Sequence, residues 1–311
     1  MSGRIYSLGS SWPRVVLVAT MAALGPACSV KTFAVKTVAN TLSEPGDTFT
    51  RDDDPELVRA ALPFGLKTFE SLLESVPNHR PLLIATCSGF TSYAYAFVET
   101  DADLLASDQY DKAKALRDEA LKLYLRARGY CWRALEVRFG KGINDRLKAD
   151  PMAALVGAKK DDVPLLYWSA ASLGAAISLA KGRTDLVVDL PIIRAMAERA
   201  LALDDGWSNG SLHELMITIE SQGEAFGGSE ARARQHFDRA VALQKGRSPG
   251  PFVSLATNVS RASQDRSEFE KLLNQALAID PAADRSNQLV AIITQRRARS
   301  LLEHIDDLFI Q

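Results

Sequence analysis

A short alanine-rich pattern recurs three times in the C-terminal half of this chain and limits the folds open to it. The stretches ERALALDD, DRAVALQK and NQALAIDP place Ala200, Ala240 and Ala276 at equivalent positions. In each, that alanine is followed by a bulky apolar residue, a second alanine, another bulky apolar residue and a polar turn. FESLLESVP, which contains Phe69, is a more distant fourth copy. Such a recurrence predicts a series of similar units that share their cores with their neighbours.

The repeated units are expected to be helical hairpins. Tetratricopeptide (TPR) repeats recur at about 34 residues, and the copy that ends at Pro281 is the best match. Helix-favouring residues dominate the chain, and no convincing strand pattern interrupts them. The sequence therefore predicts an all-α fold, a TPR-like helical hairpin stack or α-solenoid. The helices expected after residue 80 are 81–99, 109–138, 163–181, 190–203, 211–222, 230–244, 266–279 and 283–309.

The folded unit is expected to open with a helix that begins at Pro55. Asp54 before it suits the N-cap, and proline suits the first helical position. An apolar stripe at helical spacing follows, made of Leu62, Leu66, Phe69 and Leu73. Pro63 falls inside this pattern and is expected to kink or split the helix, because proline cannot donate a backbone hydrogen bond.

The N-terminus is typical of an exported protein. Arg4 and Arg14 precede the apolar run VVLVATMAAL, which is too short to span a bilayer. The run ends in GPAC, where a small residue precedes Cys28 as in bacterial lipoprotein signals, although the Gly-Pro pair departs from the usual pattern. We expect export, and lipid attachment at Cys28 that would anchor the protein to a membrane without spanning it.

Three regions follow from this organisation. We expect a signal peptide at 1–27, an N-terminal anchor segment and linker at 28–50, and a single TPR-like helical domain at 51–311. Ser29 stands where an aspartate is associated with retention in the inner membrane, which favours the outer membrane mildly.

Charge and cysteine content exclude some classes of function. The net charge is -1 and the pI is about 6.5, so no basic excess is available to neutralise nucleic-acid phosphates. Cys87 and Cys131 remain once Cys28 is set aside. An exported protein permits a disulfide between them. We favour instead two buried free cysteines that act as small apolar residues.

Two stretches without internal charge stand out. One is VPLLYWSAASLGAAISLA at 163–180, and the other is LLIATCSGFTSYAYAFVE at 82–99. The first is at the lower limit for a membrane span and is diluted by serine and glycine, so a buried helix of the stack is the better interpretation. Both stretches could form core, which we favour, or line a cavity. Their aromatic residues are Tyr93, Tyr95, Phe97, Tyr167 and Trp168; Tyr93 and Phe97 share a face from which Tyr95 points away.

Several short motifs suggest catalysis or metal binding but lack the required context. GWSNG has the pattern of a nucleophile elbow, but helix rather than strand precedes it, so Ser208 is expected in a loop and Ser211 as a helix cap. HELMI lacks the second histidine of a zinc helix, so His213 and Glu214 are expected to make polar contacts between helices. We expect no enzyme activity, no cofactor and no metal site.

Four stretches together resemble the TatT component family of tripartite ATP-independent periplasmic (TRAP) transporters. They are DDDPELVRAALPFGLKTFESLL, SGFTSYAYAFVE, KKDDVPLLYWSAASLGAAISLAKG and SLHELMITIES. The resemblance implies TPR-like hairpins, a homo-oligomer that is a trimer, and a periplasmic solute-binding protein as partner. It also implies a pore or cleft for an apolar small molecule. The residues in the matching motifs are Tyr93, Tyr95, Phe97, Tyr167, Trp168, His213 and Glu214.

The expected function is that of a non-enzymatic periplasmic accessory protein of a TRAP-type uptake system. It would dock the solute-binding protein and bind or relay a hydrophobic small molecule. The alternative is an envelope scaffold lipoprotein that binds protein partners and no small ligand.

Overall fold

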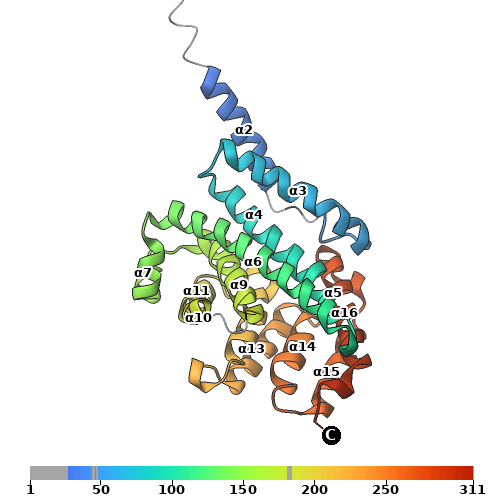
Figure 1. Ribbon diagram of the computed structural model, residues 1–311. Helices are drawn as coiled ribbons and strands as arrows, with labels where there is room; N and C mark the ends of the chain where they lie inside the picture. The colour runs from blue at the N-terminus through green and yellow to red at the C-terminus, as the bar shows by residue number, and fades with distance from the viewer. Residues whose placement is uncertain (1–26, 44–45, 47, 181–183, 311) are drawn as a thin grey trace, which may run out of the picture.

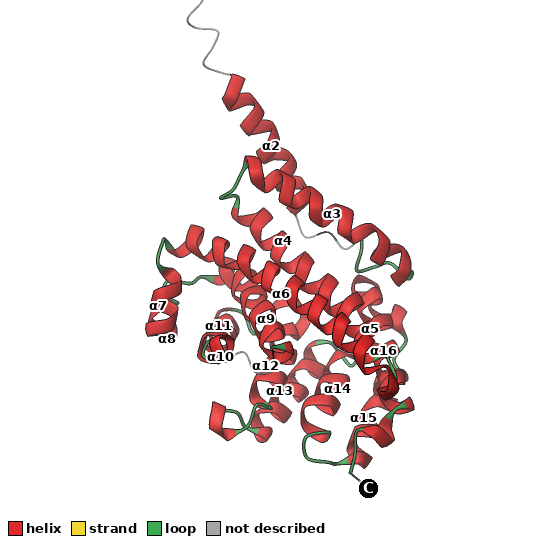
Figure 2. Cartoon of the chain, viewed as in Figure 1, coloured by secondary structure: helices red, strands yellow, loops and turns green. Residues whose placement is uncertain are grey.

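The helices of this protein stack on one another without any sheet. The computed structural model describes residues 27–43, 46, 48–180 and 184–310, and no strand occurs among them (Figures 1 and 2). This confirms the all-α prediction. The α-helices are α2 (Ala27–Ser43), α3 (Pro55–Ser75), α4 (Arg80–Tyr93), α5 (Thr100–Asp103), α6 (Tyr110–Phe139), α7 (Ile143–Ala149), α8 (Pro151–Ala154), α9 (Val163–Leu179), α10 (Thr184–Val187), α11 (Leu190–Leu203), α12 (Ser211–Glu220), α13 (Glu230–Leu243), α14 (Gly250–Leu255), α15 (Arg266–Leu277) and α16 (Gln288–Glu303).

Successive helices pack against their neighbours along the chain. α4 packs on α6, α6 on α9 and α9 on α11, and α13, α14 and α15 lie below them in Figure 1. The three alanines of the recurring pattern, Ala200, Ala240 and Ala276, are all fully buried. A buried alanine lets two helix backbones approach closely, which explains why the pattern keeps a small residue there.

The helix that begins at Pro55 forms as predicted, but Pro63 does not split it. The Asp54 side chain accepts hydrogen bonds from the backbone of Glu56 and Leu57, and α3 runs unbroken to Ser75. Leu66 and Leu73, beyond the proline, are buried against other helices. Their burial offsets the loss of about 3 kcal/mol that an interior proline brings.

The helix predicted at 81–99 contains a change of winding. α4 continues as a π-helical turn, η1 (Ala94–Glu99), and then as α5. The Thr100 hydroxyl donates to the Tyr95 carbonyl at 2.8 Å, which satisfies a backbone group inside the wider turn. Such turns often lie at functional sites.

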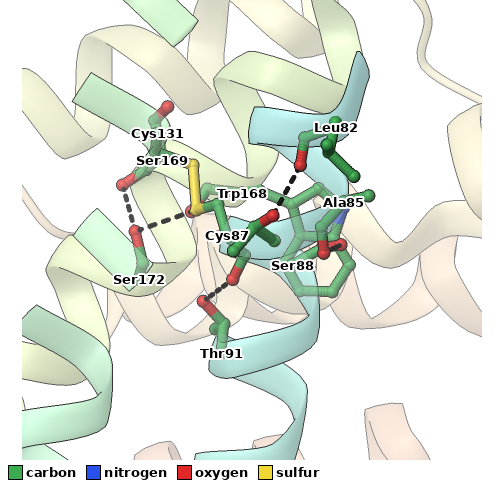
Figure 3. The surroundings of a disulfide bond; sticks show 10 residues. Leu82, Ala85, Cys87, Ser88, Thr91, Cys131, Trp168, Ser169 and Ser172 are labelled. Carbon is green, nitrogen blue, oxygen red and sulfur yellow. Dashed lines mark hydrogen bonds between the residues drawn. A yellow bond between two sulfur atoms is a disulfide. The ribbon is translucent and has the colours of Figure 1, made fainter. Parts of the chain in front are cut away.

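The two cysteines of the folded part correct our expectation of free thiols. Cys87 on α4 and Cys131 on α6 form a disulfide, with their Cα atoms 5.5 Å apart and both side chains fully buried (Figure 3). α4 and α6 pack along their lengths, and this brings the two positions face to face. The sequence could not reveal this, because the rotation of one helix relative to another is set by packing.

The last helix returns to the first part of the chain. The Leu289 backbone N–H of α16 donates to the Thr50 carbonyl at 2.9 Å, and Arg296 pairs with Glu56 of α3 at 2.9 Å. α16 also packs against α5, beside which it lies in Figure 1. The stack therefore curls until its two ends meet.

The first described helix lies against the domain rather than apart from it. In α2, inside the predicted anchor and linker segment, Ala39 is fully buried and the Asn40 side chain bonds His79 at 2.8 Å. The predicted signal peptide falls on residues 1–26 and Ala27, so all but its last residue lies outside the described part. The Cys28 side chain also lies outside it.

The uncharged stretch at 163–180 forms α9, whose buried residues include Leu165, Leu166 and Leu173. This confirms the buried helix of the stack. By length and composition alone, one helix of the described residues could cross a membrane, the continuous Arg80–Asp103, but half of its most apolar window is buried inside the protein. A core helix passes the same test.

Candidate functional site

The aromatic residues of α9 meet a third ring that the sequence did not single out. The Tyr167 and Trp168 rings lie 5.0 Å apart, edge to face, and Tyr167 lies 4.7 Å from the Trp207 ring. Trp207 comes from the 3-10 turn η4 (Trp207–Gly210), which leads into α12. All three side chains are half-buried. Burial raises the pKa of the Tyr167 hydroxyl, and the nearby Glu214 and Tyr95 add to the rise.

Glu214 is a carboxyl with no cationic partner among the described ion pairs. The Gln244 amide of the segment after α13 bonds its Oε1. A Cβ added at Gly250 would collide with its Oε2, so only glycine leaves room for this carboxyl. Glu214 is half-buried. Desolvation raises its pKa to about 7, and the Gln244 hydrogen bond opposes that rise only in part.

Tyr95 lies on η1 and joins the first part of the chain to the last helix. Its hydroxyl accepts a hydrogen bond from Arg297 Nη1 at 2.8 Å, and the guanidinium lies 5.5 Å from its ring centroid. Arg297 also pairs with Asp103 at 2.8 Å. Although Tyr95 is engaged in this way, 43% of its side chain remains accessible to solvent.

Tyr93 and Phe97 lie together on another side, as the sequence predicted. Their rings are 5.6 Å apart. Phe97 is 2% exposed and packs in a small cluster with Val58, Leu289 and Ile293. The Arg59 guanidinium lies 5.1 Å from the Phe97 ring. Phe97 is thus a core residue, placed where α16 meets α3.

His213 faces away from Glu214, which follows it on α12. Its Nε2 bonds Asp205 at 2.9 Å, and its Nδ1 lies 2.8 Å from Nδ1 of His236 on α13. The expected polar contacts between helices are confirmed. The His236 partner was missed because the two histidines are not at helical spacing. Burial and His213 both lower the pKa of His236.

Ser208 of GWSNG does not have the geometry of a nucleophile elbow. Ser208 has a positive φ of 48° within η4, and no strand precedes it in the described chain. We expected Ser211 to cap α12, but it does not. Gly210 takes the N-cap position, and the Ser211 hydroxyl donates instead to the Ser208 carbonyl at 2.9 Å. No group of three or more His, Cys, Asp or Glu among the described residues could hold a metal ion.

Comparison with known proteins decides the family. The family model described as "TRAP transporter T-component" matches residues 51–309, which is most of the chain. The chain belongs to the TRAP transporter T-component family. An uncharacterized protein of Treponema pallidum (strain Nichols) is 29% identical over 301 residues, which cover 91% of this chain and 93% of that protein.

Membership of this family establishes the general role of this T-component. It is an accessory protein of a TRAP transport system, and its family is a transporter component rather than an enzyme family. The family is in general periplasmic or associated with the cell envelope.

Two surface hollows lie away from the aromatic residues just described. One, of about 390 Å³, lies between α3 and α6 and is lined in part by Glu70, Arg126 and Arg133. The other, of about 370 Å³, lies where Arg51 and Asp53 meet Arg285 before α16. Both are lined mostly by charged and polar side chains, unlike a site for an apolar ligand.

Proposed function

We propose that this T-component docks the periplasmic solute-binding protein of its TRAP system and holds or relays a hydrophobic small molecule inside its curled stack. Tyr95, Tyr167, Trp168 and Glu214 would line the space that takes this molecule. The accessory role follows from the family; the docking and the ligand are our proposal.

One observation carries the ligand part of the proposal. The Tyr167 ring lies 4.7 Å from that of Trp207, whose turn leads directly into α12 and Glu214, and the charges of Glu214 and Tyr95 add to the raised pKa of the Tyr167 hydroxyl. Tyr167 and Glu214 are each half-buried, and burial raises the pKa of both groups. A side chain on the outer surface would be hydrated. We infer that these groups border a common interior space, which the return of α16 helps to enclose.

The proposed binding needs no covalent step. Aromatic and aliphatic walls would remove apolar ligand surface from water, at about 25 cal/mol per Å². The hydroxyls of Tyr95 and Tyr167 and the Glu214 carboxyl would orient the ligand, as a few polar groups do in most small-molecule sites.

The docking part rests on the outer face of α3. Leu57 is 59% exposed and Phe64 is 81% exposed, one above the other at helical spacing. Large apolar side chains grouped on a surface mark interaction sites.

We propose that the protein lies in the periplasm, anchored to the outer membrane through lipid on Cys28. We also propose that it forms a homotrimer.

The proposal is tested in two steps. The first is mild crosslinking and pull-down of the tagged protein from its own cells, read by mass spectrometry for partners and for lipid on Cys28. Recovery of a TRAP-type solute-binding protein supports docking. Recovery of envelope-assembly or cell-wall proteins instead would favour the alternative, a scaffold lipoprotein without a ligand.

The second step measures binding of the apolar fluorophore N-phenyl-1-naphthylamine. Tyr95→Ala and Trp168→Ala should weaken it. Tyr110→Ala is the matched control, because Tyr110 is 65% exposed at the start of α6. No binding by the unaltered protein, or equal loss in the control, would remove the ligand part and leave docking.

A further inference from the structure

Glu214 has no cationic partner among the described ion pairs, although it is half-buried. Glu70, Asp162 and Glu220 are each bonded by two cationic side chains, whereas the half-buried Glu99, like Glu214, is bonded by a neutral group, the Tyr124 hydroxyl. Glu214 has one neutral amide. A carboxylate removed from water without a cation is costly, and its raised pKa of about 7 expresses that cost.

The groups around Glu214 leave polar capacity open. Its Oε2 accepts no hydrogen bond from the described residues, and it packs against Gly250, where a Cβ would collide with it. The Gln244 Oε1 atom is buried and also without a partner. Glu214 Oε2 and Gln244 Oε1 are therefore two acceptor atoms for which the described residues provide no hydrogen-bond donor.

The aromatic rings near this carboxyl favour a positively charged donor. The Tyr167 ring packs against the rings of Trp168 and Trp207. The charge of Glu214 adds to the raised pKa of the Tyr167 hydroxyl. The faces of tyrosine and tryptophan carry negative charge density and attract ammonium groups, most strongly where water is scarce. An uncompensated carboxylate beside such rings is suited to a cation.

From these contacts we propose that Glu214 binds the ammonium head of an amphipathic amine, whose apolar tail lies along Tyr167 and Trp168. The inference rests on the proposed ligand-binding function and names its ligand class. The ammonium would donate to Glu214 Oε2, and its charge would replace the missing cation.

An anionic head is disfavoured at the same place. A carboxylate ligand would face the Glu214 charge at close range without an intervening cation. The Arg297 guanidinium, which bonds Tyr95, already pairs with Asp103. Its charge is therefore compensated within the protein.

Three probes with the same tail test the head group: n-decylammonium, 1-decanol and decanoate. Each would displace N-phenyl-1-naphthylamine from the full-length protein at pH 8, where Glu214 is largely ionised. We expect decylammonium to bind about tenfold more tightly than decanol, as a charge-assisted hydrogen bond provides, and decanoate to bind more weakly than decanol.

Glu214→Gln supplies the decisive comparison. It keeps the side-chain shape and removes the charge, so the advantage of decylammonium over decanol should disappear while decanol affinity stays within about threefold. Glu303→Gln, at an exposed position at the end of α16, is the control and should keep the advantage. A circular dichroism melt would verify that both variants fold.

The outcomes separate this inference from the function on which it rests. Equal binding of all three probes, or a preference for decanoate, would overturn the ammonium site and leave an apolar ligand site in place. If the advantage of decylammonium survives in Glu214→Gln, the site lies elsewhere and the assignment is wrong. If no probe and no fluorophore binds, both the inference and the ligand part of the proposed function fail.

Discussion

The Tyr95 hydroxyl accepts a hydrogen bond from Arg297 at 2.8 Å, although the two residues lie 202 positions apart in the chain. Tyr95 belongs to the π-helical turn that follows α4, and Arg297 belongs to α16. The same guanidinium pairs with Asp103, so one side chain ties the last helix to two points of the first part. This contact helps to turn an open stack into a closed curl.

Loss of the Arg297 contacts should loosen the last helix. We expect Arg297→Gln to lower the free energy of unfolding by about 2 kcal/mol, because it leaves Asp103 with Arg117 as its only described ion-pair partner. Tyr95→Phe, which removes only the hydroxyl, should cost about 1 kcal/mol. Urea unfolding measures both effects. Hydrogen exchange of α16 should accelerate in Arg297→Gln; unchanged exchange there would show that closure does not depend on this residue.

The disulfide should contribute strongly to stability. Cys87 and Cys131 are 44 residues apart, and closing a loop of that length is worth about 4 kcal/mol in the chain-entropy account. The double variant Cys87→Ser, Cys131→Ser should therefore melt well below the unaltered protein. Reducing agent should lower the melting temperature of the unaltered protein and leave that of the double variant unchanged. Equal melting temperatures with and without reductant would contradict the prediction.

Glu214 should make the fold less stable as the pH rises. Its pKa is about 7 in the folded protein and near 4.5 when unfolded, so between these values the folded state binds more protons. The stability that protonation provides is complete below about pH 4.5 and is lost as the pH passes 7. Glu214→Gln, which resembles the protonated form, should match the unaltered protein at about pH 4. At pH 8.5 it should be more stable, by at most roughly 3 kcal/mol. Equal stability at both pH values would place Glu214 in water.

Two adjacent aspartates before α9 should differ greatly in importance. Asp162 is 1% exposed and accepts hydrogen bonds from Arg138 at 2.7 Å and Arg80 at 2.9 Å. Asp161 is exposed. Asp162→Ala should cost about 3–5 kcal/mol, since it leaves two arginines without their shared partner. Asp161→Ala should stay within about 0.5 kcal/mol. Thermal denaturation of the pair compares them directly, and similar losses would refute the difference.

Much of the fold was determined by the sequence itself. Asp54 with Pro55 correctly predicted where α3 begins, and the helix predicted at 190–203 has the observed bounds of α11. The recurring alanines, predicted to mark units with shared cores, are fully buried. These features depend on hydrogen bonds and side chains within a few residues of one another, so the local sequence contains the information. Pro63 does not split α3, because packing on either side outweighed a local penalty.

The contacts around the candidate site depend on tertiary structure. Tyr93 and Phe97 are one helical turn apart, and their shared face could be predicted. The pairs Cys87–Cys131, His213–His236, Glu214–Gln244 and Tyr95–Arg297 could not. Each joins two elements whose relative rotation and crossing follow from the packing of many side chains at once. The sequence determined that this chain forms helices with apolar faces, and only the packing of those faces decided which residues meet in the interior.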